Sequence, residues 1–183
     1  MTTVSVIVPS VGRRSLARTL ASITCWPGDE ILVIGTWPSG VPRDPRARFL
    51  PCIAGQDTGA TERRLGMTAA RGDYLVFLDD DDTHYRTTRA VLAAVMTDAA
   101  DRVTVCRVRY PSGRTIWIDP VLRFGNVSGQ MVVAPNDPAR LGQWTSRYGQ
   151  DFDFLATMAF DGLVWNRHVI ACLGHEPAVQ VAR

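Results

Sequence analysis

The chain has 183 residues, 46% of them hydrophobic, so it is long enough to bury one sizeable core and short for two domains. A formal net charge of +2 argues against a protein held on nucleic acid mainly by bulk electrostatics. All 20 Lys or Arg residues are arginine, which excludes Schiff-base chemistry and a P-loop lysine. Because no apolar run approaches a membrane span and the N-terminus has no basic leader, we expect a cytoplasmic protein without a stable membrane anchor.

The first hundred residues alternate apolar and amphipathic runs, which is typical of an α/β fold. The pattern predicts strands at 4–8, 31–34, 49–53 and 74–78, and helices from about Ser15, over 61–70 and over 87–96. Ser15 is the expected N-cap of the first helix, and Gly72 is the glycine expected to end the second. Residues 35–45 are rich in Pro and Gly and are expected to form a loop. This order fits a mostly parallel sheet with its ligand-binding edge at Pro9-Ser10, Gly35-Thr36 and Asp79 to Asp82.

The pattern changes after Asp101. Residues 103–110 and 114–118 flank Pro111-Ser112-Gly113 and predict a hairpin. A strand is expected at 130–134, a helix within 144–159, and an extended segment at 162–172. The whole chain, 1–183, is therefore expected to be one α/β domain whose C-terminal third is short and irregular.

The cysteines are scattered along the chain without Cys-x-x-Cys spacing. They are Cys25, Cys52, Cys106 and Cys172. Buried thiols are therefore expected, in preference to a zinc site or a disulfide framework.

An apolar strand, Tyr74 to Leu78, runs directly into four consecutive aspartates, Asp79 to Asp82. Adjacent anions repel each other, so folding alone gives little reason to gather them at the ligand edge of a sheet. A hard divalent cation resolves this conflict, and carboxylate oxygens suit Mg²⁺ or Mn²⁺. The alternative is a solvated acidic turn before the positive end of a helix.

Four segments together resemble the family 2 glycosyltransferases, which have the GT-A fold. Val4-Ser5-Val6-Ile7-Val8-Pro9-Ser10 looks like the opening strand of that family, and Phe77 to Asp82 resembles its metal-binding DxD segment. The stretch Arg63 to Tyr74 is similar to ARN-x-G-x-x-x-A-x-G-x-Y, with Arg64 in place of Asn. Trp144 followed by Gly149-Gln150-Asp151-Phe152-Asp153 resembles the W...ED-x-D segment that carries the catalytic base.

This resemblance implies transfer of a sugar from a nucleotide-diphosphate sugar, with a UDP-sugar as the first expectation, assisted by Mn²⁺ or Mg²⁺. Asp79 and Asp81 are the expected metal site, with Asp81 as the direct ligand and Asp79 nearer the ribose or sugar, while the roles of Asp80 and Asp82 stay open. The remaining implied roles are Arg63 at the diphosphate, Pro9, Ser10 and Asp80 in donor binding, Asp151 as catalytic base, and Asp153 as second choice for that base. Residues 1–100 would form the nucleotide-sugar-binding half and 101–183 the acceptor and catalytic half.

Histidine offers one further ligand. Arg167-His168 looks like an Arg-His pair found at the end of the family's catalytic region, so His168 is expected to complete the metal shell or touch the diphosphate. A purely structural histidine is the alternative. His84 and His175 are weaker candidates.

The chain also departs from the family pattern. Many relatives carry an acidic residue after the second strand that holds the nucleotide base, and this chain has Gly35-Thr36-Trp37 there. The base is therefore left open, and Trp37 either stacks on it or packs within its own loop. Gln150 replaces the usual Glu. A single carboxylate base with no second nucleophile implies inversion at the anomeric carbon.

Other functions remain as alternatives. Asp79 to Thr83 also fits the DxDxT motif of haloacid dehalogenase-type phosphatases, which usually place it near the N-terminus and need a downstream lysine. An inactive nucleotide-sugar-binding protein is the non-enzyme alternative. The acceptor is open among a glycan, a lipid carrier, a small molecule and, as in some phage enzymes, a hydroxymethylated DNA base, and the oligomeric state is also open.

Overall fold

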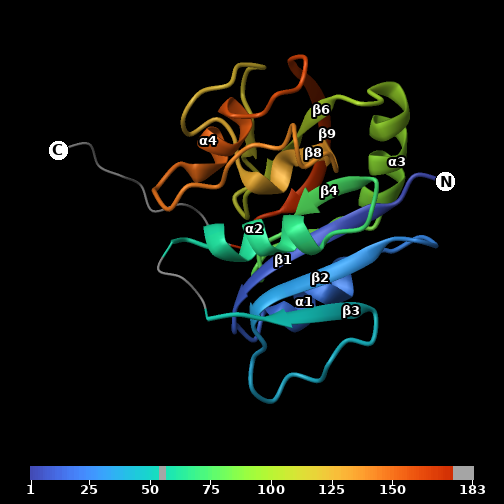
Figure 1. Cartoon of the computed structure of the whole chain (residues 1–183), viewed down its shortest axis with the longest axis vertical. Helices are drawn as coiled ribbons and strands as arrows, with labels where there is room; N and C mark the ends of the chain where they lie inside the picture. Colours follow the sequence, from blue (N-terminus) through green and yellow to red (C-terminus); the bar gives the residue numbers. More distant parts are fainter. Residues whose placement is uncertain (54–56, 175–183) are drawn as a thin grey trace.

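The computed structural model describes residues 1–53 and 57–174. Within them, nine strands form one sheet in the order β3-β2-β1-β4-β8-β6-β9-β5, with β7 paired to β6 (Figure 1). The strands are β1 (Val4–Val11), β2 (Glu30–Thr36), β3 (Ala47–Pro51), β4 (Tyr74–Phe77), β5 (Thr83–His84), β6 (Val103–Arg109), β7 (Thr115–Ile116), β8 (Val132–Pro135) and β9 (Leu163–Cys172). The helices are α1 (Leu16–Ser22), α2 (Ala60–Ala69), α3 (Thr88–Asp98), the short 3₁₀ helix η1 (Gly129–Met131) and α4 (Gln150–Ala156).

Strand direction follows from the pairings. β1 pairs in parallel with β2 and β4, β2 with β3, and β6 with β9, whereas β8 is antiparallel to both β4 and β6. β5 and β7 are antiparallel to their partners β9 and β6. Most strands therefore run in one direction, and the expected α/β fold with a mostly parallel sheet is confirmed.

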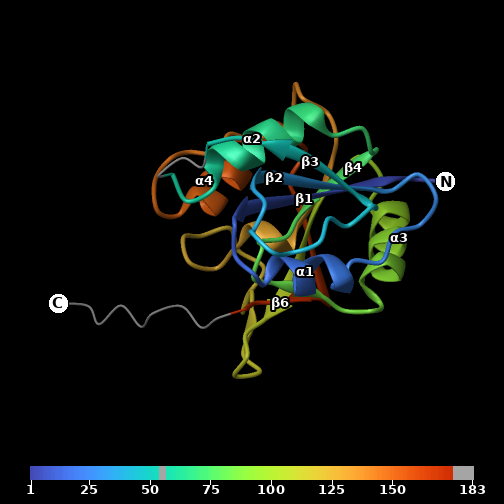
Figure 2. The ribbon, with the colours of Figure 1, turned by 90° about the horizontal axis from the view of Figure 1, so that it is seen from below.

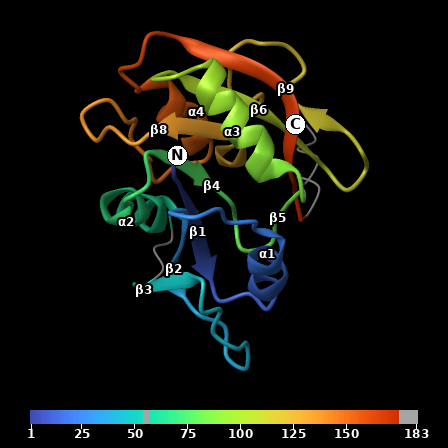
Figure 3. The ribbon, with the colours of Figure 1, turned by 90° about the vertical axis from the view of Figure 1, so that its right-hand side faces the viewer.

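Helices cover both faces of the sheet, which explains why its central strands are continuous apolar runs. Figures 2 and 3 show α2 on one face of β1, and α1 with α3 on the other. Val4 to Ser10 and Tyr74 to Leu78 are buried along their whole length. Helix α2 lies unusually close to β1, because a Cβ atom on Gly66 would lie 2.4 Å from Cγ2 of Ile7.

The order in which strands are added to the sheet changes direction at β1. From β1 the sheet continues through β2 to β3 on one side, and β4 lies on the other side. In open α/β sheets, such a switch point opens a crevice at the carboxyl ends of the strands, where ligands bind. Here Ser10 and Val11 lie at the carboxyl end of β1, and the four aspartates follow the carboxyl end of the neighbouring strand β4.

Several predicted boundaries shift. β1 extends to Val11, β2 includes Gly35 and Thr36, which were expected in a loop, and β3 lies two residues earlier than expected. The short strand β5 was not predicted, because two residues carry no periodicity.

One predicted cap is confirmed in position and the other is wrong. Ser15 is the N-cap of α1, as expected, although its side chain makes no capping hydrogen bond. Gly72 does not end α2, whose C-cap is Ala70 in an extended conformation. The backbone N–H of Gly72 instead donates to Ser5 Oγ at 2.8 Å, and a Cβ there would lie 2.6 Å from the Ser5 nitrogen. This glycine is required by close packing against β1.

All four cysteines are free, with Cys106 buried and Cys25, Cys52 and Cys172 half-buried. Within the described ranges, no helix is both long and apolar enough to cross a membrane.

Candidate active site

The four consecutive aspartates point in different directions. Asp80 is turned inward, with a side chain that is 1% exposed. It accepts hydrogen bonds from Ser10 Oγ and the Val11 N–H, both at 3.0 Å, and from Arg13 Nη1 at 2.6 Å. The family resemblance implies a donor-binding role for Pro9, Ser10 and Asp80. In the structure the Ser10 hydroxyl and the Asp80 carboxylate are bonded to each other and connect the end of β1 to the turn after β4.

Asp79 and Asp82 face each other across one amide. Gln130 Nε2 donates to Asp79 Oδ2 at 2.9 Å and to Asp82 Oδ2 at 2.7 Å. Asp82 also accepts the Gly174 N–H at 2.7 Å. Burial, reinforced by the negative charges of Asp79 and Asp81, raises the pKa of Asp82 to about 8. Without a cation nearby, Asp82 therefore tends to keep its proton near neutral pH.

The side chain of Asp81 is 20% exposed, and its Oδ2 lies 3.6 Å from Arg13 Nη1. It lines a hollow of about 310 Å³ together with Arg18, Thr83 and the turn after β9. Asp79 and Asp82, by contrast, line a larger pocket of about 470 Å³.

The acidic run fits a hard cation in the chemistry of its donors, since two carboxylates converge on one nitrogen and the charge of Asp79 adds to burial in raising the pKa of Asp82, a cost that a cation would relieve. It does not supply a full set of ligands. Across the described part of the chain, no group of three or more His, Cys, Asp or Glu side chains is arranged to hold a metal ion. A cation here would need oxygen ligands from a bound substrate or from water, which is how Mg²⁺ sites at phosphates are usually completed.

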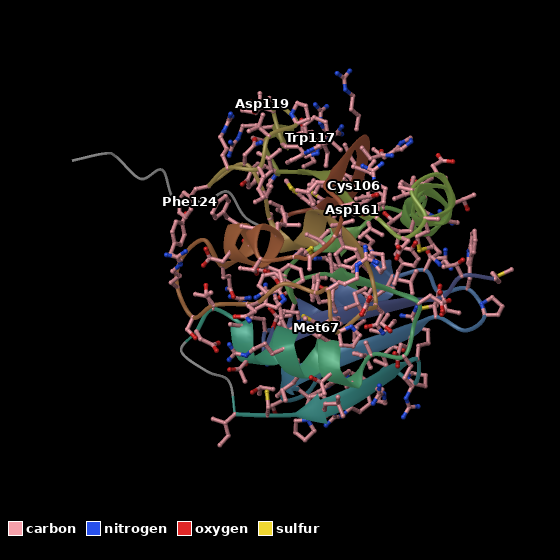
Figure 4. The ribbon with its side chains drawn as sticks, turned by 45° about the horizontal axis from the view of Figure 1, so that its top comes forward. Met67, Cys106, Trp117, Asp119, Phe124 and Asp161 are labelled. Atoms are coloured by element: carbon pink, nitrogen blue, oxygen red, sulfur yellow. The ribbon has the colours of Figure 1, made fainter. Side chains whose placement is uncertain are left out.

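The larger pocket is enclosed by segments far apart in the sequence. Arg63 comes from α2, Asp79 and Asp82 follow β4, and Asp151 lies in the first turn of α4. The β6–β7 hairpin contributes Tyr110, Arg114 and Ile116. The segment before η1 contributes Phe124, Gly125, Val127 and Ser128. Phe124 projects beside α4, at the opposite end of its segment from Trp117 and Asp119 (Figure 4).

Arg63 and Arg114 are the cations among the described residues that line the pocket, and Arg63 is the buried one. It is 5% exposed, and its Nη2 lies 2.5 Å from Asp79 Oδ1. Its guanidinium also stacks 4.8 Å from the ring centroid of Trp144. That tryptophan is held by ring contacts to Phe77 of β4 and Phe154 of α4. The aromatic cluster therefore fixes the arginine between the acidic run and α4.

Asp151 and Asp153 differ sharply. Asp151 lines the pocket, and burial raises its pKa to about 6, with Arg63 and the Gly129 N–H acting in the opposite direction and Asp79 in the same one. Asp153 is outside the pocket lining and accepts hydrogen bonds from Arg147 Nε and Thr145 Oγ1, both at 2.6 Å. These bonds, led by that from Arg147, lower the pKa of Asp153 to about 2.

The structure does not bring every candidate residue together. His168 is exposed on β9 and is not part of the pocket lining, and Pro9 is buried in β1. Trp37 packs edge-on against Phe49, and the guanidinium of Arg43 stacks on both rings. The indole Nε1 of Trp37 donates a hydrogen bond to the Val41 carbonyl. Trp37 therefore packs within its own loop, which was the second of the two expected roles. His84 is half-buried in β5, and burial of its ring lowers its pKa to about 4, while His175 lies outside the described residues.

Sequence reasoning missed several pocket residues. Gln130 was expected only as the start of a strand, and Tyr110, Arg114, Phe124 and Tyr148 belong to no recognised motif. Their one sequence signal is composition, because exposed aromatic residues in irregular segments often mark binding surfaces.

Comparison with known proteins follows the same lines. The model of the family described as Glycosyl transferase family 2 matches residues 39–158, more than half of the chain. No curated protein matches the chain.

Among solved structures, S. aureus TarS 1-349 matches with a TM-score of 0.68 and 14% identity, over 94% of this chain and 60% of TarS 1-349. The same protein in complex with UDP-GlcNAc matches with a TM-score of 0.67 and 13% identity, over 100% of this chain and 62% of the other. This chain thus spans about 60% of the length of TarS 1-349. The likeness establishes a shared GT-A fold, and the family model establishes kinship: the chain belongs to glycosyl transferase family 2.

Proposed function

We propose that the protein transfers a sugar from a nucleotide-diphosphate sugar, in the first instance a UDP-sugar, to an acceptor hydroxyl, with a divalent cation and with inversion at the anomeric carbon. One observation carries this proposal: Arg63, Asp79 and Asp151 share one pocket although they come from three distant segments. Membership of glycosyl transferase family 2 supports the reaction class, and the TarS complexes with UDP and UDP-GlcNAc support the donor.

The first task of the pocket is to bind a diphosphate. Arg63 is a permanent cation whose planar donors match phosphate oxygens. In the absence of donor it pairs with Asp79, so a phosphate competes with that carboxylate for the guanidinium. A cation bound at the acidic run, held by Asp79, Asp81 or Asp82, would supply the remaining neutralisation of the leaving diphosphate.

The second task is to deprotonate the acceptor. A general base works best when its pKa lies near the working pH, and the pKa of Asp151 is raised to about 6. The Gly129 N–H orients the carboxylate, and a Cβ atom at Gly129 would come within 3.1 Å of Asp151 Oδ1. The glycine therefore keeps room for the base.

We also propose one functional domain, with residues 1–100 holding the donor and 101–183 presenting the base and the acceptor site. The acceptor remains a choice among a glycan, a lipid carrier, a small molecule and a modified DNA base. The exposed rings of Phe124 and Tyr148 at the pocket favour an acceptor with a ring that stacks.

The test is turnover. The purified protein, incubated with UDP-sugars, Mn²⁺ and a panel of acceptors, is expected to release UDP in step with a glycosylated product detected by mass spectrometry. Phosphate release from a phosphomonoester without sugar transfer would indicate a phosphatase. Binding of the donor without transfer or hydrolysis would indicate an inactive binding protein.

A further inference from the structure

One backbone carbonyl joins the two halves of the pocket. The carbonyl of Thr58, just before α2, accepts hydrogen bonds from Arg63 Nη1 at 2.9 Å and from Gln150 Nε2 at 2.8 Å. Gln150 Nε2 also donates to the hydroxyl of Thr58. All three residues line the pocket. The arginine proposed to bind the diphosphate is therefore linked through Thr58 to the first residue of α4.

The turn that carries this carbonyl has a conformation that threonine disfavours. The φ angles of Thr58 and Gly59 are +55° and +87°. Glycine adopts this left-handed region readily, whereas a β-branched residue is strained there and stays only where its surroundings hold it. A Cβ atom on residue 59 would lie 2.7 Å from Arg63 Nη1, so the shape of the turn and the place of the guanidinium depend on each other. Gln150 supplies contacts that hold Thr58 in this conformation.

Stability alone does not explain a glutamine at position 150. The side chain is buried, and its Oε1 has no hydrogen-bond partner among the described residues. A buried acceptor without a partner offsets much of what the two donated bonds contribute. An amide nevertheless suits this place better than the glutamate that is usual in the family, because an ionised carboxylate has only acceptors and would face a carbonyl.

The link to Thr58 matters most once a donor is bound. The guanidinium of Arg63 is held by Thr58 at Nη1 and by Asp79 at Nη2. In the proposed reaction a phosphate competes with Asp79 for this guanidinium. The Thr58 carbonyl and the stacking on Trp144 then remain to orient Arg63.

We infer that Gln150 is a positioning residue for donor binding: it fixes the turn at Thr58, and that turn aims Arg63 at the diphosphate. This inference rests on the proposed function, in which Arg63 binds the diphosphate. Gln150 needs no contact with the donor for this role. Its effect reaches the donor through Thr58 and Arg63, from the same helix turn that carries Asp151.

The test is calorimetry in the presence of Mn²⁺, with whichever of UDP, GDP, CDP and ADP the wild-type protein binds most tightly. Gln150→Met keeps an unbranched side chain of similar length and removes both donated hydrogen bonds. It is expected to weaken nucleotide binding about threefold to tenfold, a loss of the size that one hydrogen bond typically contributes.

A second substitution separates a positioning role from a direct contact. Thr58→Asn introduces a residue that adopts the left-handed region more readily than threonine. In the Gln150→Met background it is expected to recover most of the lost affinity, because the turn then keeps its conformation without the amide. Loss of a direct contact between Gln150 and the nucleotide would not be recovered in this way.

Gln143→Met is the matched control, because Gln143 is exposed and outside the pocket lining. It should leave nucleotide affinity unchanged. Circular dichroism and melting without nucleotide show whether each variant is folded. Gln150→Asn, which shortens the side chain by one methylene and so withdraws its amide from Thr58, takes the place of Gln150→Met if that variant does not fold, and the same loss of affinity is expected.

Two results overturn the inference. One is a folded Gln150→Met protein that binds the nucleotide as tightly as the wild type does. The other is a double variant with Thr58→Asn that binds no more tightly than Gln150→Met alone. Both leave the proposed sugar transfer intact, whereas a wild-type protein that binds no nucleoside diphosphate overturns the proposed function and this inference with it.

Discussion

The pKa values of two carboxylates in the first turn of α4 are shifted in opposite directions. The pKa of Asp151 is raised to about 6 and that of Asp153 is lowered to about 2. These divergent pKa values support the proposed role of Asp151 as the base, because of the two only Asp151 lines the pocket and has a pKa suited to taking a proton.

Asp151→Asn is therefore expected to bind donor as the wild type does and to lose transfer by about 10²- to 10⁴-fold, the usual contribution of a general base. Donor affinity by calorimetry and initial rates of UDP release separate the two effects. Asp153→Asn is the control: it breaks the bonds to Arg147 and Thr145, so it should lower the melting temperature and spare turnover. An inactive, folded Asp153→Asn beside an active Asp151→Asn would reverse the assignment.

The same base predicts a pH profile. Asp151 accepts a proton only when ionised, so kcat/KM is expected to rise with pH through a pKa of about 6 and to be lost below it. Initial rates between pH 4.5 and 8 measure this limb. The residual activity of Asp151→Asn should lack it, and a limb that persists in that variant would belong to another group.

Metal binding is expected to depend on Asp81. Asp81→Asn should abolish Mn²⁺-dependent donor binding and leave the fold intact, because it removes one anion from a repelling cluster. Asp80→Asn should instead lower stability, since Asp80 fastens Ser10, Val11 and Arg13. Thermal shift with donor, with and without Mn²⁺, distinguishes them. If Asp82→Asn loses the metal response and Asp81→Asn keeps it, the ligand is the pocket-facing aspartate.

Among the elements, the segment 124–128 and the turn before α4 both line the pocket. Phe124 and Tyr148 are 56% and 70% exposed and meet edge-on at 5.6 Å. Gly149 follows Tyr148 and packs directly against Phe124. Its φ of +88° favours glycine, and a Cβ atom there would lie 2.0 Å from the Phe124 ring. Solvent-exposed rings contribute little to the core, so their placement suits contact with a ligand.

Phe124→Ala is accordingly expected to raise KM for the acceptor several-fold while leaving donor affinity and melting temperature nearly unchanged. Steady-state kinetics with the acceptor varied at saturating donor test this. Leu65→Ala is a matched control, because Leu65 is 43% exposed and outside the pocket lining. An equal loss of donor affinity would place Phe124 in the donor site.

For the whole molecule, the periodicity of hydrophobic residues along the sequence predicted the central strands and the main helices. The buried runs of β1, β2 and β4 and the helix α2 were recognised, whereas the ligand-binding edge expected beside them stays a prediction. Side-chain direction within Asp79 to Asp82 was not predictable, since it depends on Ser10, Arg13 and Gln130 from other segments. The isolation of His168 from the pocket depends likewise on how β9 lies beside β6.

The stereochemistry of transfer follows from which groups the fold gathers in the pocket. Among the described residues that line it, the carboxylates are Asp79, Asp82 and Asp151. Asp79 and Asp82 are bonded to Arg63 and Gln130 in the acidic run, which leaves Asp151 to activate the acceptor. A double displacement needs a second nucleophile on the opposite face of the sugar, and the described lining offers no carboxylate beyond these three for that task.

A single in-line displacement therefore inverts the anomeric carbon, so an α-linked donor is expected to give a β-linked product. The anomeric proton of the purified product, observed by NMR, decides between the two configurations. A retained α linkage would require an enzyme-bound sugar intermediate, and trapping that intermediate on Asp79 or Asp82 by mass spectrometry would show that the acidic run, rather than Asp151, carries the reaction.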